Sequence, residues 1–348
     1  MGAYECGVYK TLHKHKIKFD IVAGTSIGGI NAAIIAGSKN NEPAKDLEDF
    51  WLTLAETVTP SFLDDKARAF SSSMYSAMWG NSKVFQPIWF KPNSFNFLYN
   101  YPYLYDITPL KNTLKQYVDF DKLKNPDRPR LIVTSTDIQS GKSSVFDSKY
   151  DNIGAENVLA SAGFPFYGIS WTKIDDRYLW DGTLLSNTPL TEVIDASPKY
   201  DKKVFMVNLF PHNQQEIPKN MIEVWHRARD IMHTDKTDHT VRMSKTISSY
   251  LEMLKEMHDI IMENFDAEKL DEKSKERFKK IAPKYHKFAV ERGAIIKEII
   301  RIERQEDTHF LFEDADFSNT TIKQLIQNGE KDAEIHLQRS EQRKKEKR

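Results

Sequence analysis

The chain has 348 residues, of which 40% are hydrophobic and 29% are charged, so it can build the core of a globular protein. The 50 Lys and Arg residues balance the 50 Asp and Glu residues, which leaves no net positive charge to favour nucleic acid. Cys6 is the only cysteine, which excludes an intrachain disulfide, and no apolar run is long enough to span a bilayer. We therefore expect a cytoplasmic protein whose contact with membranes would be peripheral.

The most informative segment covers residues 19–37. Residues 19–23, Phe-Asp-Ile-Val-Ala, predict a short buried strand. Residues 30–36 are rich in Ala and Ile and predict a buried helix that ends at Gly37. Between them, Gly24-Thr-Ser-Ile-Gly28 matches G-x-S-x-G (GXSXG), the pattern of a nucleophilic serine on a sharp strand-to-helix turn.

The pattern has a physical reason in the backbone at Ser26. A serine on such a turn is strained, and side chains two positions before or after it would collide, which favours Gly24 and Gly28. The Ser26 hydroxyl would lie at the helix N-terminus, where the Ile27 N–H and the helix dipole can stabilise an oxyanion. The alternative is a glycine-rich turn for close packing or phosphate binding, but no Gly-Lys-Ser/Thr follows, which disfavours a P-loop.

Residues 70–105 are rich in aromatic side chains. The aromatic positions are Phe70, Tyr75, Trp79, Phe85, Trp89, Phe90, Phe95, Phe97, Tyr99, Tyr101, Tyr103 and Tyr105. Because aromatic side chains bury large apolar areas, the segment would suit a lid or acyl-binding wall, or a belt at a lipid interface. An ordinary packed loop is the alternative.

Composition changes along the chain and indicates two parts. Apolar runs predict further strands at residues 130–134 and 204–210, and the helical stretches between the runs indicate an α/β domain with a largely parallel sheet. Beyond Pro218, helix breakers are rare and charged residues recur with helical spacing. We expect the α/β domain to cover residues 1–213 and a charged α-helical extension with a basic tail to cover residues 214–348.

The extension carries two further patterns. An apolar stripe about one helix face wide consists of Ile247, Tyr250, Leu251, Leu254, Met257 and Ile261. Core packing is its simplest interpretation, with the stripe docked on the α/β domain rather than on a membrane. Residues 339–348 hold six basic and two acidic residues, which predicts a solvated, disordered tail; weak attraction to anionic lipid is the alternative.

Two later segments carry a family resemblance together with Gly24–Gly28. Residues 160–165 are Ala-Ser-Ala-Gly-Phe-Pro, and residues 178–189 are Tyr-Leu-Trp-Asp-Gly-Thr-Leu-Leu-Ser-Asn-Thr-Pro. In this order and spacing they resemble the patatin-like phospholipase family, with its "ASxAxP" signature and its "DGG/DGA" aspartate at Asp181. Residues 104–110 are similar to the family's middle segment. The resemblance implies a patatin-like sheet sandwiched by helices.

The resemblance also implies a serine lipid acyl-hydrolase of the phospholipase or esterase type. Ser26 would attack an acyl carbonyl and Asp181 would take its proton directly, through an acyl-enzyme intermediate. Because the reference pKa of Asp is about 3.9, Asp181 can act as a base only if it is desolvated or held tightly against Ser26. Gly182 and Asn187 are expected to support this dyad. The implied substrate is a lipid or phospholipid acyl ester, with no metal and no cofactor.

The N-terminus departs from the family's pattern. Patatin-like domains begin with a strand and a glycine-rich loop, GGGx(K/R)G, which supplies N–H groups to the oxyanion hole. Gly2 matches only the last glycine of that loop, and residues 3–12 resemble the helix that follows. We expect that the sequence starts at an internal methionine of a longer protein, rather than being a naturally shortened, weakened enzyme. The reason is that a sheet without its central strand would leave backbone N–H and C=O groups of the neighbouring strands unpaired. Thr183 in place of Gly or Ala is a milder departure.

Two other functions remain open. A non-catalytic lipid-binding or scaffold protein would keep the cleft without turnover, and the incomplete oxyanion loop favours it. An ordinary α/β-hydrolase would pair Ser26 with His212, but such enzymes place several strands before the turn that carries the nucleophilic serine. Loss of ester turnover in Ser26→Ala would exclude the first, and retained turnover in His212→Ala would exclude the second.

Overall fold

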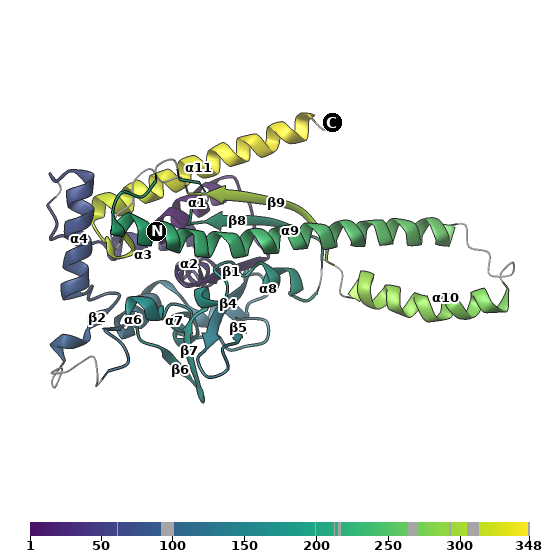
Figure 1. Ribbon diagram of the computed structural model, residues 1–348, viewed down its shortest axis with the longest axis horizontal. Coiled ribbons are helices and arrows are strands. Elements are labelled where there is room, and N and C mark those ends of the chain that lie inside the picture. The colour runs from purple at the N-terminus through teal and green to yellow at the C-terminus, as the bar shows by residue number, and fades with distance from the viewer. Residues whose placement is uncertain are drawn as a thin grey trace. The chain divides into compact units, whose positions relative to one another are not determined.

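The computed structural model describes residues 1–60, 62–91, 101–198, 200–211, 213–214, 217–263, 271–291, 294–304 and 313–346 (Figure 1). The helices are α1 (Gly2–Lys14), α2 (Ile27–Ala36), α3 (Pro43–Thr53), α4 (Asp65–Trp79), α6 (Thr108–Tyr117), α7 (Ala155–Ala160), α8 (Leu190–Asp195), α9 (Met221–Glu263), α10 (Glu272–Tyr285) and α11 (Asn319–Glu346). The short helical turns are η1 (Ile88–Phe90), η2 (Phe120–Lys124), η3 (Pro165–Tyr167), η4 (Gly182–Leu184), the π-helical η6 (His286–Glu291) and η7 (Glu313–Ala315). The strands are β1 (Ile21–Thr25), β2 (Gln86–Pro87), β3 (Tyr105–Asp106), β4 (Arg130–Asp137), β5 (Ser143–Asp147), β6 (Thr172–Ile174), β7 (Arg177–Asp181), β8 (Lys202–Asn208) and β9 (Ile296–Glu303).

The chain forms two compact units. The first unit contains residues 1–189, 207–236 and 301–348, and the second contains residues 190–206 and 237–300. Among the described residues, no helix is both long enough and apolar enough to cross a membrane.

A central sheet organises the first unit. Its strand order is β1-β4-β7-β6, and β5 also pairs with β4. The predicted α/β class is confirmed, but the prediction of a largely parallel sheet is wrong: of the four strand pairings that this sheet makes among the described residues, only β1–β4 is parallel. The reason is that short turns join β4 to β5 and β6 to β7, and such turns can connect only antiparallel strands. The strand predicted at 204–210 is β8, which pairs with β9 in a separate sheet.

The register around β4 brings two strand ends together. β5 covers one edge of β4, and both β1 and β7 pair with residues of β4 that β5 also pairs, so they share the other edge. Because β1 is parallel and β7 antiparallel to β4, the two strands run toward each other. Their last residues, Thr25 and Asp181, pair with the neighbouring Thr134 and Ser135 of β4.

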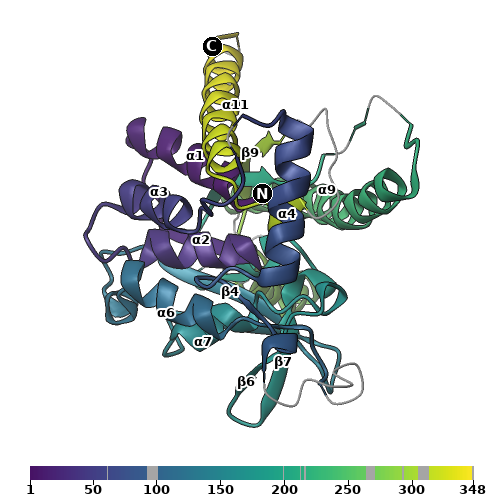
Figure 2. The ribbon, with the colours of Figure 1, turned by 90° about the vertical axis from the view of Figure 1, so that its left-hand side faces the viewer.

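An inner layer of helices packs on this sheet, and an outer layer of helices packs on the inner one. α2 and α7 pack against the strands, while α1, α3 and α6 pack against α2 or α7, as Figure 2 shows for α2 between α1 and β4. Leu131 and Val133 of β4 share one hydrophobic core with the Ala- and Ile-rich α2. α2 ends at Ala36 with Gly37 as its C-cap, as the sequence predicts.

α11 crosses α1 at two glycines. A Cβ on Gly7 would lie 1.9 Å from the carbonyl oxygen of Ile326, and one on Gly329 would lie 2.1 Å from that of Tyr4. The two backbones therefore touch where no side chain separates them. The Tyr4 hydroxyl also donates a hydrogen bond of 2.8 Å to Asp332. α11 is thus packed into the first unit.

The segment expected to form a helical extension contains other elements as well. Residues 296–303 form the strand β9, and residues 339–346 continue α11 rather than forming a disordered tail. The interpretation of the apolar stripe as core is wrong for five of its six members: Leu251 is buried, whereas Ile247, Tyr250, Leu254, Met257 and Ile261 are exposed. The reason is that α9 buries the adjacent face, through Ser248 and Leu251.

Candidate active site

Ser26 lies between β1 and α2 with φ 55° and ψ −124°, a conformation that L-residues rarely adopt. Such strain costs about 1–3 kcal/mol and clusters at functional sites. Gly24 provides the space for the turn, because a Cβ there would lie 2.1 Å from the backbone of Gly28. A Cβ on Gly28 would meet only the Glu5 carboxylate, at 3.6 Å, among the described residues within 4 Å. The steric reason for the motif therefore holds at Gly24 and fails at Gly28.

Asp181 ends β7, and only 1% of its surface is exposed. Its carboxylate accepts a hydrogen bond of 2.8 Å from the Thr183 N–H, and the Ser26 side chain lies close enough to lower its pKa. Its backbone is fixed as well, because its N–H donates to the Gly163 carbonyl and its carbonyl accepts from the Thr136 hydroxyl, both at 3.0 Å. The structure thus brings Ser26 and Asp181 together.

The environment of Asp181 changes its acidity. Burial raises the pKa of Asp181 to about 6, and the hydrogen bonds from Ser26 and Thr183 oppose this rise. A carboxylate with this pKa is a stronger base than an exposed one and is still deprotonated at neutral pH. The Thr183 N–H donates to Asp181, and the Thr183 side chain, which departs from the family's pattern, also lowers the pKa of Asp181.

The residues predicted to support Asp181 lie on the chain that follows it. A Cβ on Gly182 would lie 2.6 Å from the Thr134 carbonyl oxygen and 2.9 Å from the Thr25 side chain. A side chain at this position would therefore push Asp181 away from β4. Asn187 lies half-buried in the loop after η4.

Ser161 connects the strand-to-helix turn at Ser26 with the central sheet through hydrogen bonds. It is fully buried in the Ala-Ser-Ala-Gly-Phe-Pro segment that follows α7. Its hydroxyl donates to the Thr134 carbonyl at 2.6 Å and accepts from the Ser26 N–H at 2.7 Å. The Ser26 N–H is therefore engaged, and the first turn of α2, beginning at Ile27, is where N–H groups lack partners within the helix. The sequence analysis did not assign this role to Ser161, although the "ASxAxP" signature at residues 160–165 contains this serine.

The start of α1 packs against the start of α2. A Cβ on Gly2 would lie 2.3 Å from the Ile27 side chain. Buried Asn31 donates to the Gly2 carbonyl at 3.0 Å and to the Glu5 carboxylate at 2.6 Å, and accepts from the Trp51 indole N–H at 3.0 Å. Burial raises the pKa of Glu5 to about 7, and the hydrogen bond from Asn31 opposes this rise. Gly2, predicted to belong to the oxyanion loop, thus lies beside Ile27.

Some side chains of the aromatic segment, residues 70–105, pack against one another as pairs of rings. Trp79 stacks on Phe90 at 5.5 Å between ring centroids, and Phe85 meets Tyr105 edge-on at 5.2 Å. Residues 92–100 and His212 lie outside the described residues, so the aromatic-wall and His212 predictions are untested at those positions.

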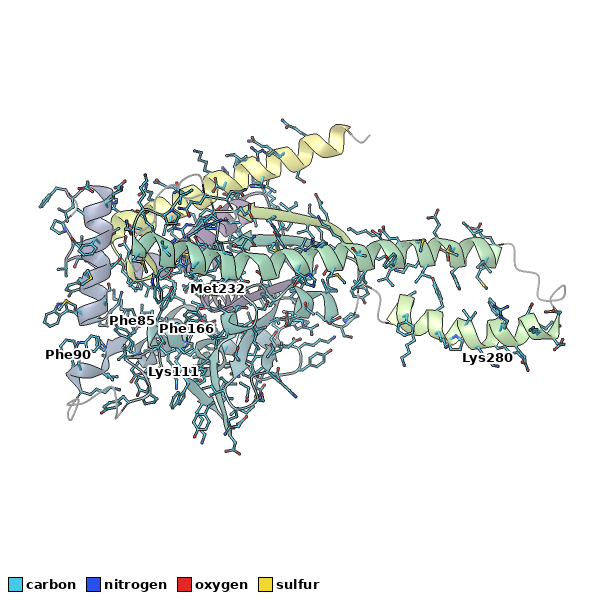
Figure 3. All side chains as sticks on the ribbon, in the orientation of Figure 1. Phe85, Phe90, Lys111, Phe166, Met232 and Lys280 are labelled. Carbon is cyan, nitrogen blue, oxygen red and sulfur yellow. The ribbon has the colours of Figure 1, made fainter. Side chains whose placement is uncertain are left out.

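One apolar side chain is exposed just after the first signature segment and another within the second. Phe166, labelled in Figure 3, is 80% exposed, and Leu185 is 41% exposed. Phe166 follows Ser161 by five residues and Leu185 follows Thr183 by two, so both exposed side chains lie close in sequence to groups that contact Ser26 or Asp181.

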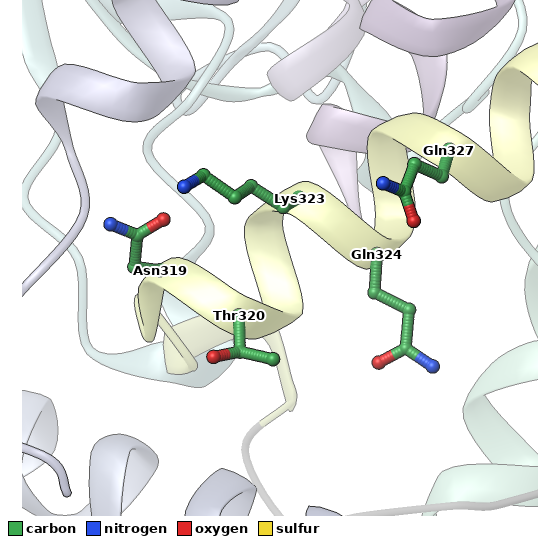
Figure 4. A pocket seen from close by; sticks show the side chains of 5 residues that line it. All are labelled: Asn319, Thr320, Lys323, Gln324 and Gln327. Atoms are coloured by element: carbon green, nitrogen blue, oxygen red, sulfur yellow. The ribbon is translucent and has the colours of Figure 1, made fainter. Parts of the chain in front are cut away.

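A surface hollow of about 580 Å³ opens on α11. Figure 4 shows its lining residues Asn319, Thr320, Lys323, Gln324 and Gln327. These polar residues lie on the first turns of one helix, and none contributes to the Ser26–Asp181 pair.

A family model described as "Patatin-like phospholipase" matches residues 1–194. No curated protein matches the sequence. Among solved structures, the chain is similar to VipD from Legionella pneumophila, with a TM-score of 0.38 and 11% sequence identity over 97% of this chain. The match covers 64% of the VipD chain.

Proposed function

Because the chain belongs to the patatin-like phospholipase family, we propose that it hydrolyses lipid acyl esters with Ser26 as nucleophile and Asp181 as general base. The observation that carries this proposal is that β1 and β7 end at neighbouring residues of β4, so that Ser26, on its strained turn, lies beside the buried Asp181 carboxylate and lowers its pKa. Family membership supports lipid acyl-hydrolase chemistry, and the local geometry supports these two residues for it.

The proposed reaction has two halves. Ser26 Oγ attacks the acyl carbonyl carbon while Asp181 takes the hydroxyl proton, and the resulting oxyanion is stabilised by the Ile27 N–H and the N-terminal dipole of α2. The bond to the leaving alcohol then breaks, and Asp181 returns the proton to the leaving oxygen. Water attacks the acyl-enzyme with Asp181 again as base, which releases the fatty acid and restores Ser26.

The proposed substrate is a phospholipid or a related acyl ester. Exposed Phe166 and Leu185 support this choice, because they are apolar side chains close in sequence to Ser161 and Thr183 and could contact an acyl chain. Peripheral contact with a membrane surface is part of the same proposal, since such substrates reside in lipid assemblies.

Labelling by a fluorophosphonate, which reacts with activated serines, tests the proposal. We expect the purified chain to be labelled, and labelling and ester turnover to be lost in Ser26→Ala and Asp181→Ala. Ser140→Ala is the matched control, since this serine lies on the β4–β5 turn, away from the pair. A wild-type chain that binds lipid vesicles but is neither labelled nor active would instead support the non-catalytic lipid-binding alternative.

The pH dependence of turnover should report the raised pKa of Asp181. We expect kcat/KM to be level above pH 7 and to fall about tenfold per pH unit below about pH 6, because protonated Asp181 cannot accept the Ser26 proton. Thr183→Ala removes the side-chain hydrogen bond that lowers this pKa, so its profile should shift to higher pH. Steady-state rates from pH 5 to 8 measure both, and a flat wild-type profile would contradict the assignment of the base.

Ser161→Ala should separate positioning from folding. It leaves the Ser26 N–H and the Thr134 carbonyl without their hydroxyl partner, so we expect kcat to fall about 10–100-fold with little change in KM. Ser148→Ala is the control, because the buried Ser148 hydroxyl accepts from the Leu131 N–H at the other end of β4, at 2.9 Å. Both variants should lose similar stability in thermal unfolding. Equal kcat values in the two variants would mean that Ser161 has only a structural role.

A further inference from the structure

The part of α9 that lies in the second unit has one covered face. Between residues 241 and 258, the covered or half-covered positions are Val241, Ser244, Ser248, Leu251, Lys255 and His258. The Ser248 hydroxyl accepts a hydrogen bond of 3.0 Å from the Ile296 N–H of β9. This face therefore packs within the second unit itself.

A neighbouring face of the same helix is apolar and exposed. Its members are Met243, Ile247, Tyr250, Met253, Leu254, Met257, Ile260 and Ile261, each exposed by 44% to 59%. We call this set the α9 apolar face. No charged side chain belongs to it. Monomeric proteins rarely leave an apolar surface of this size in water.

The spacing of the α9 apolar face is that of a coiled coil. Six of its residues follow one another at steps of four, three, four, three and four: Met243, Ile247, Tyr250, Leu254, Met257 and Ile261. These steps place Ile247, Leu254 and Ile261 at a positions of a heptad and the other three at d positions. Met253 and Ile260 then occupy the g positions, which widens the seam. This pattern is typical of a helix that packs along another helix.

We propose that the α9 apolar face pairs with the same face of a second copy of this chain, as two antiparallel helices related by a two-fold axis. The exposed surface is sufficient in area. The eight apolar side chains are each about half exposed, so together they offer an area on the order of 700 Å², close to the roughly 800 Å² that each partner buries in a specific interface. A two-fold interface joins identical patches, so the face needs no other partner.

Charge selects the antiparallel orientation. Residues 239–249 carry Arg242 and Lys245 and no acidic residue, a charge of +2 with His neutral. Residues 250–263 carry four acidic residues and Lys255, which gives −4 + 1 = −3. An antiparallel pair brings the basic half of each helix alongside the acidic half of the other, whereas a parallel pair brings halves of like net charge alongside. The charged residues lie at b, c and f positions, so this is a long-range attraction rather than direct pairing in the seam.

This orientation fixes the layers of the seam. When the two-fold axis passes beside residue 252, Tyr250 of one copy packs on Leu254 of the other, and Ile247 packs on Met257. The outermost layer joins Met243 to Ile261. Each layer combines an a position with a d position, as antiparallel pairing of heptads requires.

The oligomeric state of the full chain tests the proposal. Sedimentation equilibrium should show a dimer, and Leu254→Glu should raise the dimer dissociation constant by about 100-fold or more, because it buries an unpaired charge in the seam. Ser249→Glu is the matched control: Ser249 is exposed on the polar face of the same helix and should leave the dimer intact. A monomeric wild-type chain, or a Leu254→Glu variant that dimerises like the wild type, would overturn the proposal.

Disulfide trapping tests the orientation. The natural thiol of Cys6 is buried, so disulfides between introduced cysteines can be formed without its participation. When Tyr250→Cys and Leu254→Cys chains are mixed and oxidised, the antiparallel pair predicts mainly the mixed disulfide. A predominance of the two symmetric disulfides would show parallel packing and would refute the antiparallel arrangement.

Discussion

Replacing Asp181 by Asn is expected to lower kcat/KM for acyl esters by about 10³–10⁴-fold while making the fold more stable at pH 8. The loss of activity follows from the missing base. The gain in stability follows from burial, which raises the pKa of Asp181 from 3.8 to about 6, so that the folded state holds the proton more tightly than the unfolded state. The stability linked to this proton is present at low pH and is lost as the pH rises from about 4 through about 6.

The size of this effect can be bounded. A carboxyl whose pKa rises from 3.8 to about 6 on folding loses at most about 3 kcal/mol of stability at high pH, and the Asp181→Asn variant avoids this loss because an amide does not ionise. Thermal unfolding at pH 5 and pH 8 measures it, and the gain from Asp181→Asn should be larger at pH 8. Asp46→Asn is the opposite control, since hydrogen bonds from Ser38 and Asn40 outweigh desolvation and lower the pKa of this buried carboxyl, so its loss should destabilise the fold at pH 8. An Asp181→Asn variant that is less stable at both pH values would contradict the argument.

Gly24→Ala and Gly28→Ala are expected to differ sharply, although G-x-S-x-G treats the two glycines alike. The Gly24 Cβ would overlap the backbone of Gly28, so we expect a loss of at least about 2 kcal/mol in stability and about 100-fold in kcat as Ser26 moves. The Gly28 Cβ would contact only the Glu5 carboxylate at an ordinary distance. Alanine there should be nearly neutral in stability, since Ala is the better helix former.

Urea unfolding and steady-state kinetics of the two variants decide this prediction. Similar losses in both would mean that the Gly28 position is constrained by substrate or by the oxyanion, rather than by packing within the chain.

The elbow can be predicted from sequence because its signals are contiguous. A buried strand, two glycines and an Ala-rich helix follow one another around Ser26, and each element forms where its own residues favour it. The assignment of Asp181 depends on a family resemblance, since Asp-Gly by itself indicates only a turn.

Other features depend on pairings that local patterns do not contain. The meeting of Thr25 and Asp181 at one edge of β4 follows from the register of three strands, and the apolar runs do not reveal that β7 is antiparallel. Ser161 contacts Ser26 across 135 positions of sequence, which no local pattern can show. The apolar spacing of α9 correctly predicts a helical stripe, but periodicity does not reveal whether a stripe is covered by the same chain or remains exposed.

The glycine crossing of α1 and α11 has a consequence for biosynthesis. The Tyr4–Asp332 hydrogen bond joins residues 328 positions apart, and the surface of α1 that α11 covers includes the backbone at Gly7. During translation α1 is made early, but its partner helix emerges only after all of the preceding elements have left the ribosome. The first unit, with Gly2 of α1 against Ile27 beside Ser26, therefore cannot complete its packing until α11 has been synthesised, and until then a glycine-lined strip of α1 stays open to chaperones.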